Sequence, residues 1–215
     1  MMGLHEEVLL APNGKPSNLS PELYRLVRTP EFKNWFGDWE NNPSEASKVV
    51  DENGEPMVVY HGSPNIFDVF NRQKSRGGVK EFGHYFATNY ELAKVYGENV
   101  YPAFLNLRKI KIFDANKKTN IEAWNDLEVQ ASYKLAKNRD AMEFLKDGGW
   151  GVEKVDGIRA DNIADLYLGF YPDEKQINKF LGTVFLVFDG NENRIKLADG
   201  SNTTFNPNST NIKNE

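Results

Sequence analysis

Residues suited to chemistry gather in two short segments of the chain. The stretch VVYHGS places His61 before Gly62 and Ser63, at the end of a predicted strand. The stretch GHYFA carries Tyr85, and Tyr96 follows it 11 residues later. Any one of these residues, taken alone, belongs more often to the core than to a site. Together, an imidazole, a glycine and two aromatic rings indicate a ligand site assembled from separate segments.

Several common active-site patterns are missing from the sequence. Ser63 lies 2 residues after His61, but no nucleophile elbow surrounds it, which argues against a serine hydrolase. The sequence has no Walker loop, no G-x-G-x-x-G motif and no His-x-x-x-His pair. It also contains no cysteine, which excludes disulfides and thiolate zinc sites. We therefore expect no metal cofactor.

Composition narrows the class of protein further. The formal net charge is -5 and the pI is about 5.4, which argues against a general nucleic-acid binder. The longest apolar runs fall short of the roughly 20 residues that a membrane-spanning helix needs. The opening stretch MMGLHEEVLLAPNG lacks the basic and apolar regions of a signal peptide. These features predict a soluble protein of the cytoplasm without a membrane partner.

Two helices are predicted ahead of the first site segment. Residues 20–22 and 29–31 each combine an N-cap residue, a proline at the first helical position and an acidic residue in the first turn. Aromatic residues then recur at helical spacing, at Phe32, Trp35, Phe36 and Trp39. This spacing predicts a helix face that docks on a core.

The rest of the chain mixes short strands and helices. Strands are predicted over residues 57–62, 84–88, 99–114, 155–162, 182–189 and 193–198, and helices over 89–97 and 118–147. The elements do not alternate regularly as they do in parallel α/β folds, so the pattern predicts an α+β fold. Residues 200–215 are rich in Asn, Ser and Thr and predict a weakly ordered tail.

The site segments HGS, GHYFA and AKVYG resemble the nicotinamide-binding core of the diphtheria-toxin-like ADP-ribosyltransferases, a class that includes the poly(ADP-ribose) polymerases. The segments VRTPEFKNWFGDWE, SKVVDENGEPMVVYHGS and TTFNPNSTNIK are similar to the ADP-ribosyltransferase domains of phage and mobile-element polyvalent proteins. The resemblance spans roughly residues 25–210.

The resemblance implies a fold and a division of the chain. The expected ADP-ribosyltransferase fold has two packed, mostly antiparallel sheets around an NAD cleft, with a helical N-terminal segment and a helical insertion. We expect residues 1–50 to form a helical extension packed on the core. Residues 51–199 would form the ADP-ribosyltransferase domain, and residues 200–215 the tail.

The resemblance also assigns roles around the nicotinamide. His61 would bond a ribose hydroxyl, and Gly62 would bond the carboxamide through its backbone N–H and C=O. Tyr85 and Tyr96 would sandwich the nicotinamide, since two aromatic faces suit a flat cationic ring. His61 and Tyr85 are the expected catalytic residues. NAD is thus the expected substrate.

Further residues complete the expected NAD site. Ser63 would approach the adenine-side ribose, and Phe86 and Ala87 belong to the same binding segment as Tyr85. A basic stretch occupies the place of the family's donor loop and could meet the pyrophosphate; it contains Arg72, Lys74, Arg76 and Lys80. Otherwise this stretch is an ordinary solvated loop. His84 would point to the face opposite Tyr85 and is left out of the site.

One position departs from the family pattern. A glutamate usually stands just before the later aromatic–aliphatic strand, where it holds the ribose 2′-hydroxyl, but this chain has Val184 there. Loss of such a group can cost several kcal/mol of transition-state stabilisation. Asp189 or Glu192 could supply the acid instead, under another alignment.

Three functions follow from this sequence. The first is mono-ADP-ribosyl transfer from NAD to a protein or nucleic-acid target, by an effector or toxin of a phage or mobile element. The second is an inactive module that binds NAD or ADP-ribose. The third is a phage structural or interaction protein that docks through its aromatic N-terminal helices. The target, its acceptor group, the delivery route and the oligomeric state do not follow from the sequence.

Overall fold

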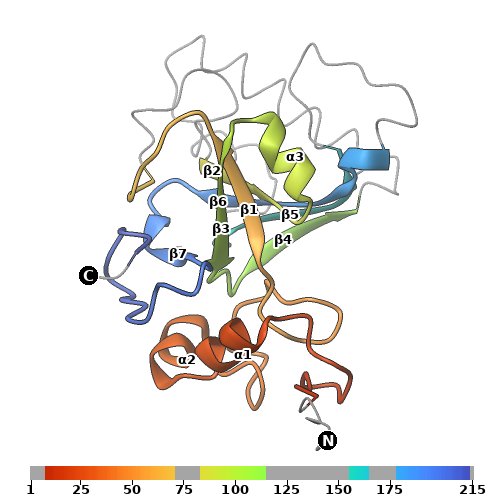
Figure 1. Cartoon of the computed structure of the whole chain (residues 1–215), viewed down its shortest axis with the longest axis vertical. Helices are drawn as coiled ribbons and strands as arrows, with labels where there is room; N and C mark the ends of the chain where they lie inside the picture. The colour runs from red at the N-terminus through yellow and green to blue at the C-terminus, as the bar shows by residue number, and fades with distance from the viewer. Residues whose placement is uncertain (1–7, 71–82, 115–154, 165–177, 214–215) are drawn as a thin grey trace, which may run out of the picture.

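The structure, a computed structural model, describes residues 8–70, 83–114, 155–164 and 178–213 (Figure 1). The predicted helix over 118–147 and the basic residues 72–80 lie outside these ranges. Within the described part, no helix is both long enough and apolar enough to cross a membrane.

The described strands form one sheet. Its order is β4-β5-β6-β2-β1-β3-β7. The bounds are β1 Val59–Ser63, β2 Gly83–Ala87, β3 Asn99–Leu105, β4 Ile110–Asp114, β5 Gly157–Ile163, β6 Gly182–Phe188 and β7 Ile195–Leu197. β4 and β5 pair in parallel, and every other recorded pair is antiparallel. The expectation of two separate packed sheets was therefore wrong for the described residues.

The strand pairing is shortest between β1 and β2. β1 pairs with β3 over five residues, from Val59 to Ser63, whereas its recorded register with β2 contains the single pair Tyr60–Ala87. β2 pairs along its whole length with β6 on its other side. This single residue pair joins two blocks of strands, β4-β5-β6-β2 and β1-β3-β7, into one continuous sheet.

Two helices begin where the N-cap residues predict. α1 spans Pro21–Val27 and α2 spans Pro30–Phe36. The hydroxyl oxygens of Ser20 and Thr29 accept hydrogen bonds from the backbone N–H groups of the third helical residues, which satisfies donors that a helix start leaves unpaired. Figure 1 shows both helices at one end of the sheet and α3, Tyr90–Val95, at the other.

The aromatic residues of the N-terminal segment are buried. Phe32, Trp35, Phe36 and Trp39 expose at most 3% of their surface. They pack with Phe104, Ala198 and Phe205 in one cluster. The predicted docking onto a core is confirmed. The idea that these rings form an external docking surface was wrong, because this core already covers them.

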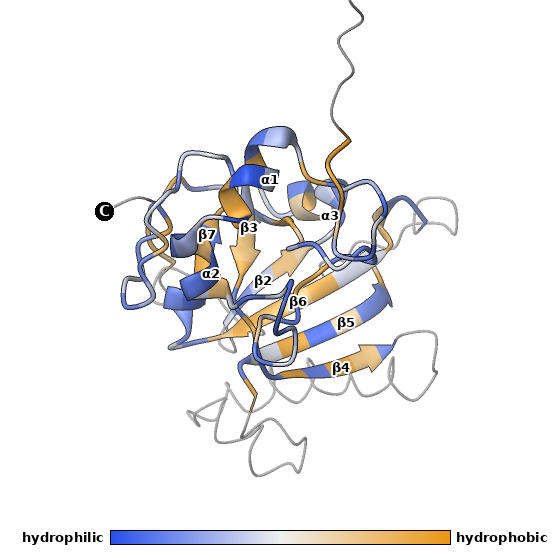
Figure 2. Cartoon of the chain, turned by 90° about the horizontal axis from the view of Figure 1, so that it is seen from below, coloured by the Kyte–Doolittle hydropathy of each residue, from blue (hydrophilic) through white to orange (hydrophobic). Residues whose placement is uncertain are grey.

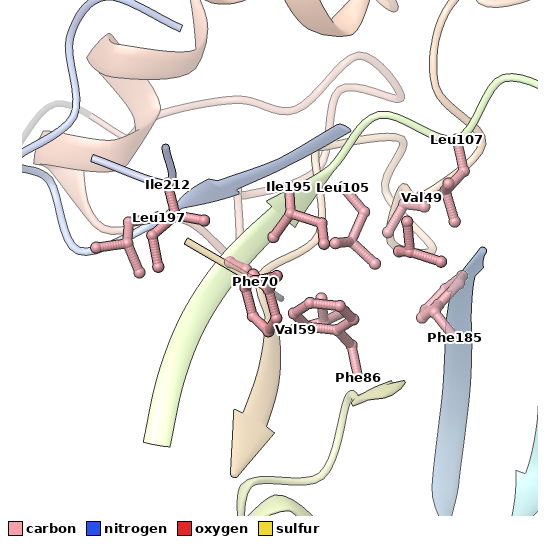
Figure 3. Close-up of a cluster of buried hydrophobic side chains, with 12 residues drawn as sticks. Val49, Val59, Phe70, Phe86, Leu105, Leu107, Phe185, Ile195, Leu197 and Ile212 are labelled. Atoms are coloured by element: carbon pink, nitrogen blue, oxygen red, sulfur yellow. The ribbon is translucent and has the colours of Figure 1, made fainter. Parts of the chain in front are cut away.

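The main core lies on one face of the sheet. Phe86, from β2, and Phe185, from β6, point into it beside Val59 and Phe70 (Figure 3). Figure 2 shows apolar residues along the central strands and polar residues on the outer turns. The long apolar runs of the sequence thus become the middle of the sheet.

The C-terminal segment packs against the protein. Phe205 and Ile212 expose 1% and 0% of their surface, and both belong to core clusters. The Lys196 ammonium is buried and donates to the carbonyl oxygens of Ser209 and Asn211, at 2.9 and 2.6 Å. The apolar side chains of residues 200–213 thus pack into the main fold, while weak order of this segment stays a prediction.

Candidate active site

His61 bridges the two blocks of strands. Its Nδ1 lies 2.7 Å from the carbonyl oxygen of Tyr85, across the junction between β1 and β2. Because a carbonyl oxygen only accepts, Nδ1 must carry the proton. Three aromatic rings surround the imidazole, with centroids 4.9 Å (Phe70), 5.4 Å (Phe86) and 6.0 Å (Phe67) away. The tautomer and the ring position are thus set by packing and by one backbone acceptor.

Gly62 and Gly97 let α3 approach β1. A Cβ on Gly62 would overlap the carbonyl oxygen of Ala93 in α3, and a Cβ on Gly97 would overlap the backbone of Ser63. Any larger residue at either position would push the helix off the strand. Gly62 therefore has a packing role in addition to the contact with the carboxamide that the resemblance implies.

Tyr85 and Tyr96 are both associated with α3. Tyr85 packs against the small cluster of Ala87, Leu92 and Val184, which includes a residue of α3. Tyr96 is the C-cap residue of α3 and is 39% exposed. The helix that ends at Tyr96 thus packs against Tyr85, and stacking of both rings on nicotinamide stays a prediction.

The remaining predicted site residues, Ser63, Phe86 and Ala87, are buried. Phe86 and Ala87 expose 1% and 5% of their surface, and Phe86 forms part of the wall around His61. The Ser63 hydroxyl accepts from the backbone N–H of Asn65 at 3.1 Å. The Ser63 carbonyl accepts from the side-chain amide of Asn99 at 3.2 Å. These residues hold the end of β1 in place.

Two residues of this site were missed from the sequence. Phe67 and Phe70 lie in a segment that carries no predicted strand or helix, yet both contact the His61 ring. The signal was available in the spacing of two aromatic residues shortly after HGS. Whether these two rings reach His61 depends on how the segment folds relative to β1, and the spacing of the aromatic residues does not determine that.

Val184 occupies an apolar environment at the start of β6. It is 2% exposed and pairs with Ala87. The neighbouring Thr183 hydroxyl donates to Asp161 Oδ1 at 2.7 Å, and the same oxygen accepts from Arg159 Nε at 2.7 Å.

Asp189 and Glu192 lie beyond the other end of β6. At a rise of about 3.3 Å per residue, Asp189 is about 17 Å along the strand from Val184. The His84 Nε2 also contacts Glu192 Oε1, at 3.3 Å. This placement argues against either carboxylate replacing the missing glutamate.

The chain was compared with protein families, curated proteins and solved structures. Residues 51–205 match the family described as ADP-ribosyltransferase in polyvalent proteins. The searches of curated proteins and of solved structures found no match. ADP-ribosyltransferases use NAD as substrate and act on macromolecular targets. The matched segment contains β1, β2 and α3, with His61, Tyr85 and Tyr96, and the chain belongs to this family of ADP-ribosyltransferases.

Proposed function

We propose that this protein transfers a single ADP-ribose unit from NAD to a macromolecular target and releases nicotinamide. The observation that carries the proposal is the bridge from His61 Nδ1 to the Tyr85 carbonyl, at the one-pair junction of β1 and β2. This bridge fixes an imidazole beside the strand that carries the first tyrosine. The family match supports the reaction class.

Each residue then has a defined task in the reaction. The bond between nicotinamide and the ribose C1′ breaks, the electron pair leaves with the now neutral nicotinamide, and a target nucleophile attacks C1′. Tyr85 and Tyr96 stack on the nicotinamide and orient the bond that breaks. With Nδ1 held by Tyr85, His61 presents Nε2 to a ribose hydroxyl. The resemblance supports this last assignment.

Val184 supports transfer of one unit rather than a polymer. In the resembling family, elongation depends on the glutamate that Val184 replaces. The side chain of Val184 packs with Ala87 and Leu92, so it contributes no hydrogen bond to a ribose. Rate acceleration would then depend on positioning, with the carboxylate supplied by the target or not at all.

The decisive experiment is incubation of the protein with NAD labelled in the adenylate part, with and without cell lysate, beside His61→Ala. We expect label on a macromolecule from the lysate, and loss of that label in the variant. Analysis of labelled fragments would identify the acceptor group. Transfer by the variant at the same rate as the wild type would contradict the proposed role of His61.

A second candidate function is binding of NAD without turnover. The buried, apolar setting of Val184 favours it, because the carboxylate bonded to the start of β6 is Asp161 of β5, which already accepts from Thr183 and Arg159. Calorimetric titration with NAD, combined with nicotinamide release, separates the two functions. Saturable binding without release in any lysate would establish the binding module.

The proposed biological role is that of a phage or mobile-element effector. The support is the family itself, which occurs in polyvalent proteins. Such an effector would act in the cytoplasm of the producing or the target cell, after delivery by a phage or a secretion route. Location of the tagged protein after infection or secretion would test this role.

A further inference from the structure

A second group of chemically capable side chains lies at the far end of β2 and β6. His84 comes from β2, Asp189 directly follows β6, and Glu192 begins the short helix η3, Glu192–Arg194. One ligand atom from each, an imidazole nitrogen or a carboxylate oxygen, lies within 4.8 Å of the others. His84 is 5% exposed and the Glu192 side chain 14% exposed. His84 is thus buried, and Asp189 and Glu192 are partly buried.

The spacing of these atoms fits a shared cation. His84 Nε2 and Glu192 Oε1 are 3.3 Å apart, longer than the roughly 2.7–2.9 Å of a charge-assisted hydrogen bond. Two ligands bound at about 2.1 Å in a tetrahedral arrangement lie about 3.4 Å apart, which is close to the observed separation. The distance is thus long for a simple pair and suitable for one edge of a metal site.

The charges favour a cation more than a simple histidine–glutamate pair. Two carboxylates beside one imidazole repel each other when both are ionised, and partial burial strengthens that repulsion. A divalent cation would offset both negative charges at once.

We propose that His84, Asp189 and Glu192 bind one divalent transition-metal cation of the zinc class. An imidazole nitrogen with two carboxylate oxygens suits such a cation, whereas calcium and magnesium prefer all-oxygen sites with more ligands. Three protein ligands leave further positions for water. The ligands are up to 108 residues apart in the chain, so their spacing carries no metal motif that the sequence could reveal.

The proposed cation site has a structural connection to the active site. Phe70 contacts both imidazoles, with its ring centroid 4.9 Å from that of His61 and 4.9 Å from that of His84. A cation would hold the start of β2 against the turn after β6, on the sheet face where Phe70 and Phe86 pack against His61. Its role is to hold this end of the sheet rather than to touch NAD.

The experiment uses the full chain, stripped with a chelator and titrated with Zn²⁺. We expect uptake of one equivalent, a rise in Tm, and visible absorption bands of a low-symmetry site when Co²⁺ replaces Zn²⁺. Asp189→Asn should lower the Zn²⁺ affinity about a hundredfold, since a lost ligand costs at least as much as a lost outer-shell partner. His84→Gln should do the same.

Two control variants carry the same chemical changes elsewhere. Asp161→Asn and His61→Asn should leave the Zn²⁺ affinity unchanged, because neither residue belongs to the group. The proposal would be overturned by uptake below one equivalent at micromolar Zn²⁺. Uptake that Asp189→Asn leaves intact, or an equal response to Ca²⁺, would overturn it as well.

Discussion

The imidazole of His61 and the backbone carbonyl of Tyr85 are hydrogen-bonded at 2.7 Å across the junction where β1 and β2 share a single residue pair. The bond ties His61 to β2, the strand that carries Tyr85. Under the proposed function the two ring nitrogens have different roles: Nδ1 bonds the Tyr85 carbonyl, and Nε2 would bond a ribose hydroxyl.

This division predicts different results for two substitutions of His61. In His61→Asn the side-chain amide can still donate to the Tyr85 carbonyl, but nothing replaces Nε2. We expect near wild-type stability and a kcat/KM for nicotinamide release reduced about tenfold to a hundredfold, which is the effect of one lost hydrogen bond of about 1.5–3 kcal/mol. His61→Ala should lose both stability and turnover. Unchanged turnover in His61→Asn would remove Nε2 from the reaction.

Gly62→Ala is expected to destabilise the protein, because the new methyl group would overlap the carbonyl oxygen of Ala93. Neither atom can move without displacing α3 or β1, so we expect a loss of about 3 kcal/mol, at the upper end for overpacking. Urea unfolding would measure it. Gly14→Ala is the control, since its φ is +78° but nothing lies within 4 Å, and it should cost about 1–2 kcal/mol. Equal losses would show that α3 does not rest on Gly62.

Tyr96→Ala should weaken NAD binding by about 1–3 kcal/mol, the effect of removing one aromatic stacking partner. The side chain is 39% exposed, so stability should change little. Tyr90→Ala is a matched control on the same helix, where the ring is 47% exposed and contacts Tyr60 at 5.4 Å. It should leave the NAD affinity unchanged in calorimetric titration. Equal effects of the two substitutions would remove Tyr96 from the site.

The sequence predicted the elements whose signals are local. Ser20 and Thr29 predict helix starts because an N-cap side chain bonds a backbone N–H only three residues later. The apolar run 184–188 predicts β6 because a strand that is buried on both faces consists of consecutive apolar residues. The paired site residues His61 and Tyr85 were predicted through resemblance to a family rather than from their positions.

The features that escaped prediction depend on distant partners. Ile212 is buried although its segment is polar, because its cavity is built by β1, β3 and β7. The packing role of Gly62 follows from where α3 docks, which spacing does not define. The proximity of His84 and Glu192 needs β2 and β6 to be paired first.

Glu55→Gln tests whether the N-terminal helices fold as one unit with the matched family segment. Glu55 is fully buried, and its carboxylate accepts from both terminal nitrogens of Arg28, at 2.6 and 3.3 Å. Arg28 lies before the matched segment and Glu55 within it. Glu55→Gln removes the charge of one partner, while Arg28 keeps its ion pair with Glu40 (Nε to Oε1, 3.0 Å), so we expect a loss of about 1.5–3 kcal/mol, the range for a hydrogen bond to a charged group.

Glu52→Gln, in the same turn, is the control for Glu55→Gln. The Glu52 side chain is exposed and bonds the exposed amide of Asn18 and its own backbone N–H, so no measurable loss of stability is expected. A single unfolding transition that shifts in Glu55→Gln alone would support one folding unit. Two transitions, with only the weaker one shifted, would contradict it.

Stability at low pH should report on Glu192. Burial favours the neutral carboxyl, but hydrogen bonds from His84 and from the backbone N–H groups of Glu192 and Gly190 lower its pKa from 4.5 to about 2. Because the folded-state pKa lies below the unfolded one, the ionised group contributes stability that is fully present above about pH 4.5. That contribution falls as the pH drops from 4.5 towards 2, since the unfolded chain then binds the proton first.

The measurement for Glu192 is the free energy of unfolding against pH for the wild type and Glu192→Gln, in chelator so that no metal contributes. Other carboxylates titrate in the same range, so the informative quantity is the difference between the two proteins. We expect this difference to be constant above pH 5 and to shrink below about pH 4.5. A difference that stays constant down to pH 2 would show that Glu192 titrates alike in the folded and unfolded chains, and that its contact with His84 contributes nothing to the fold.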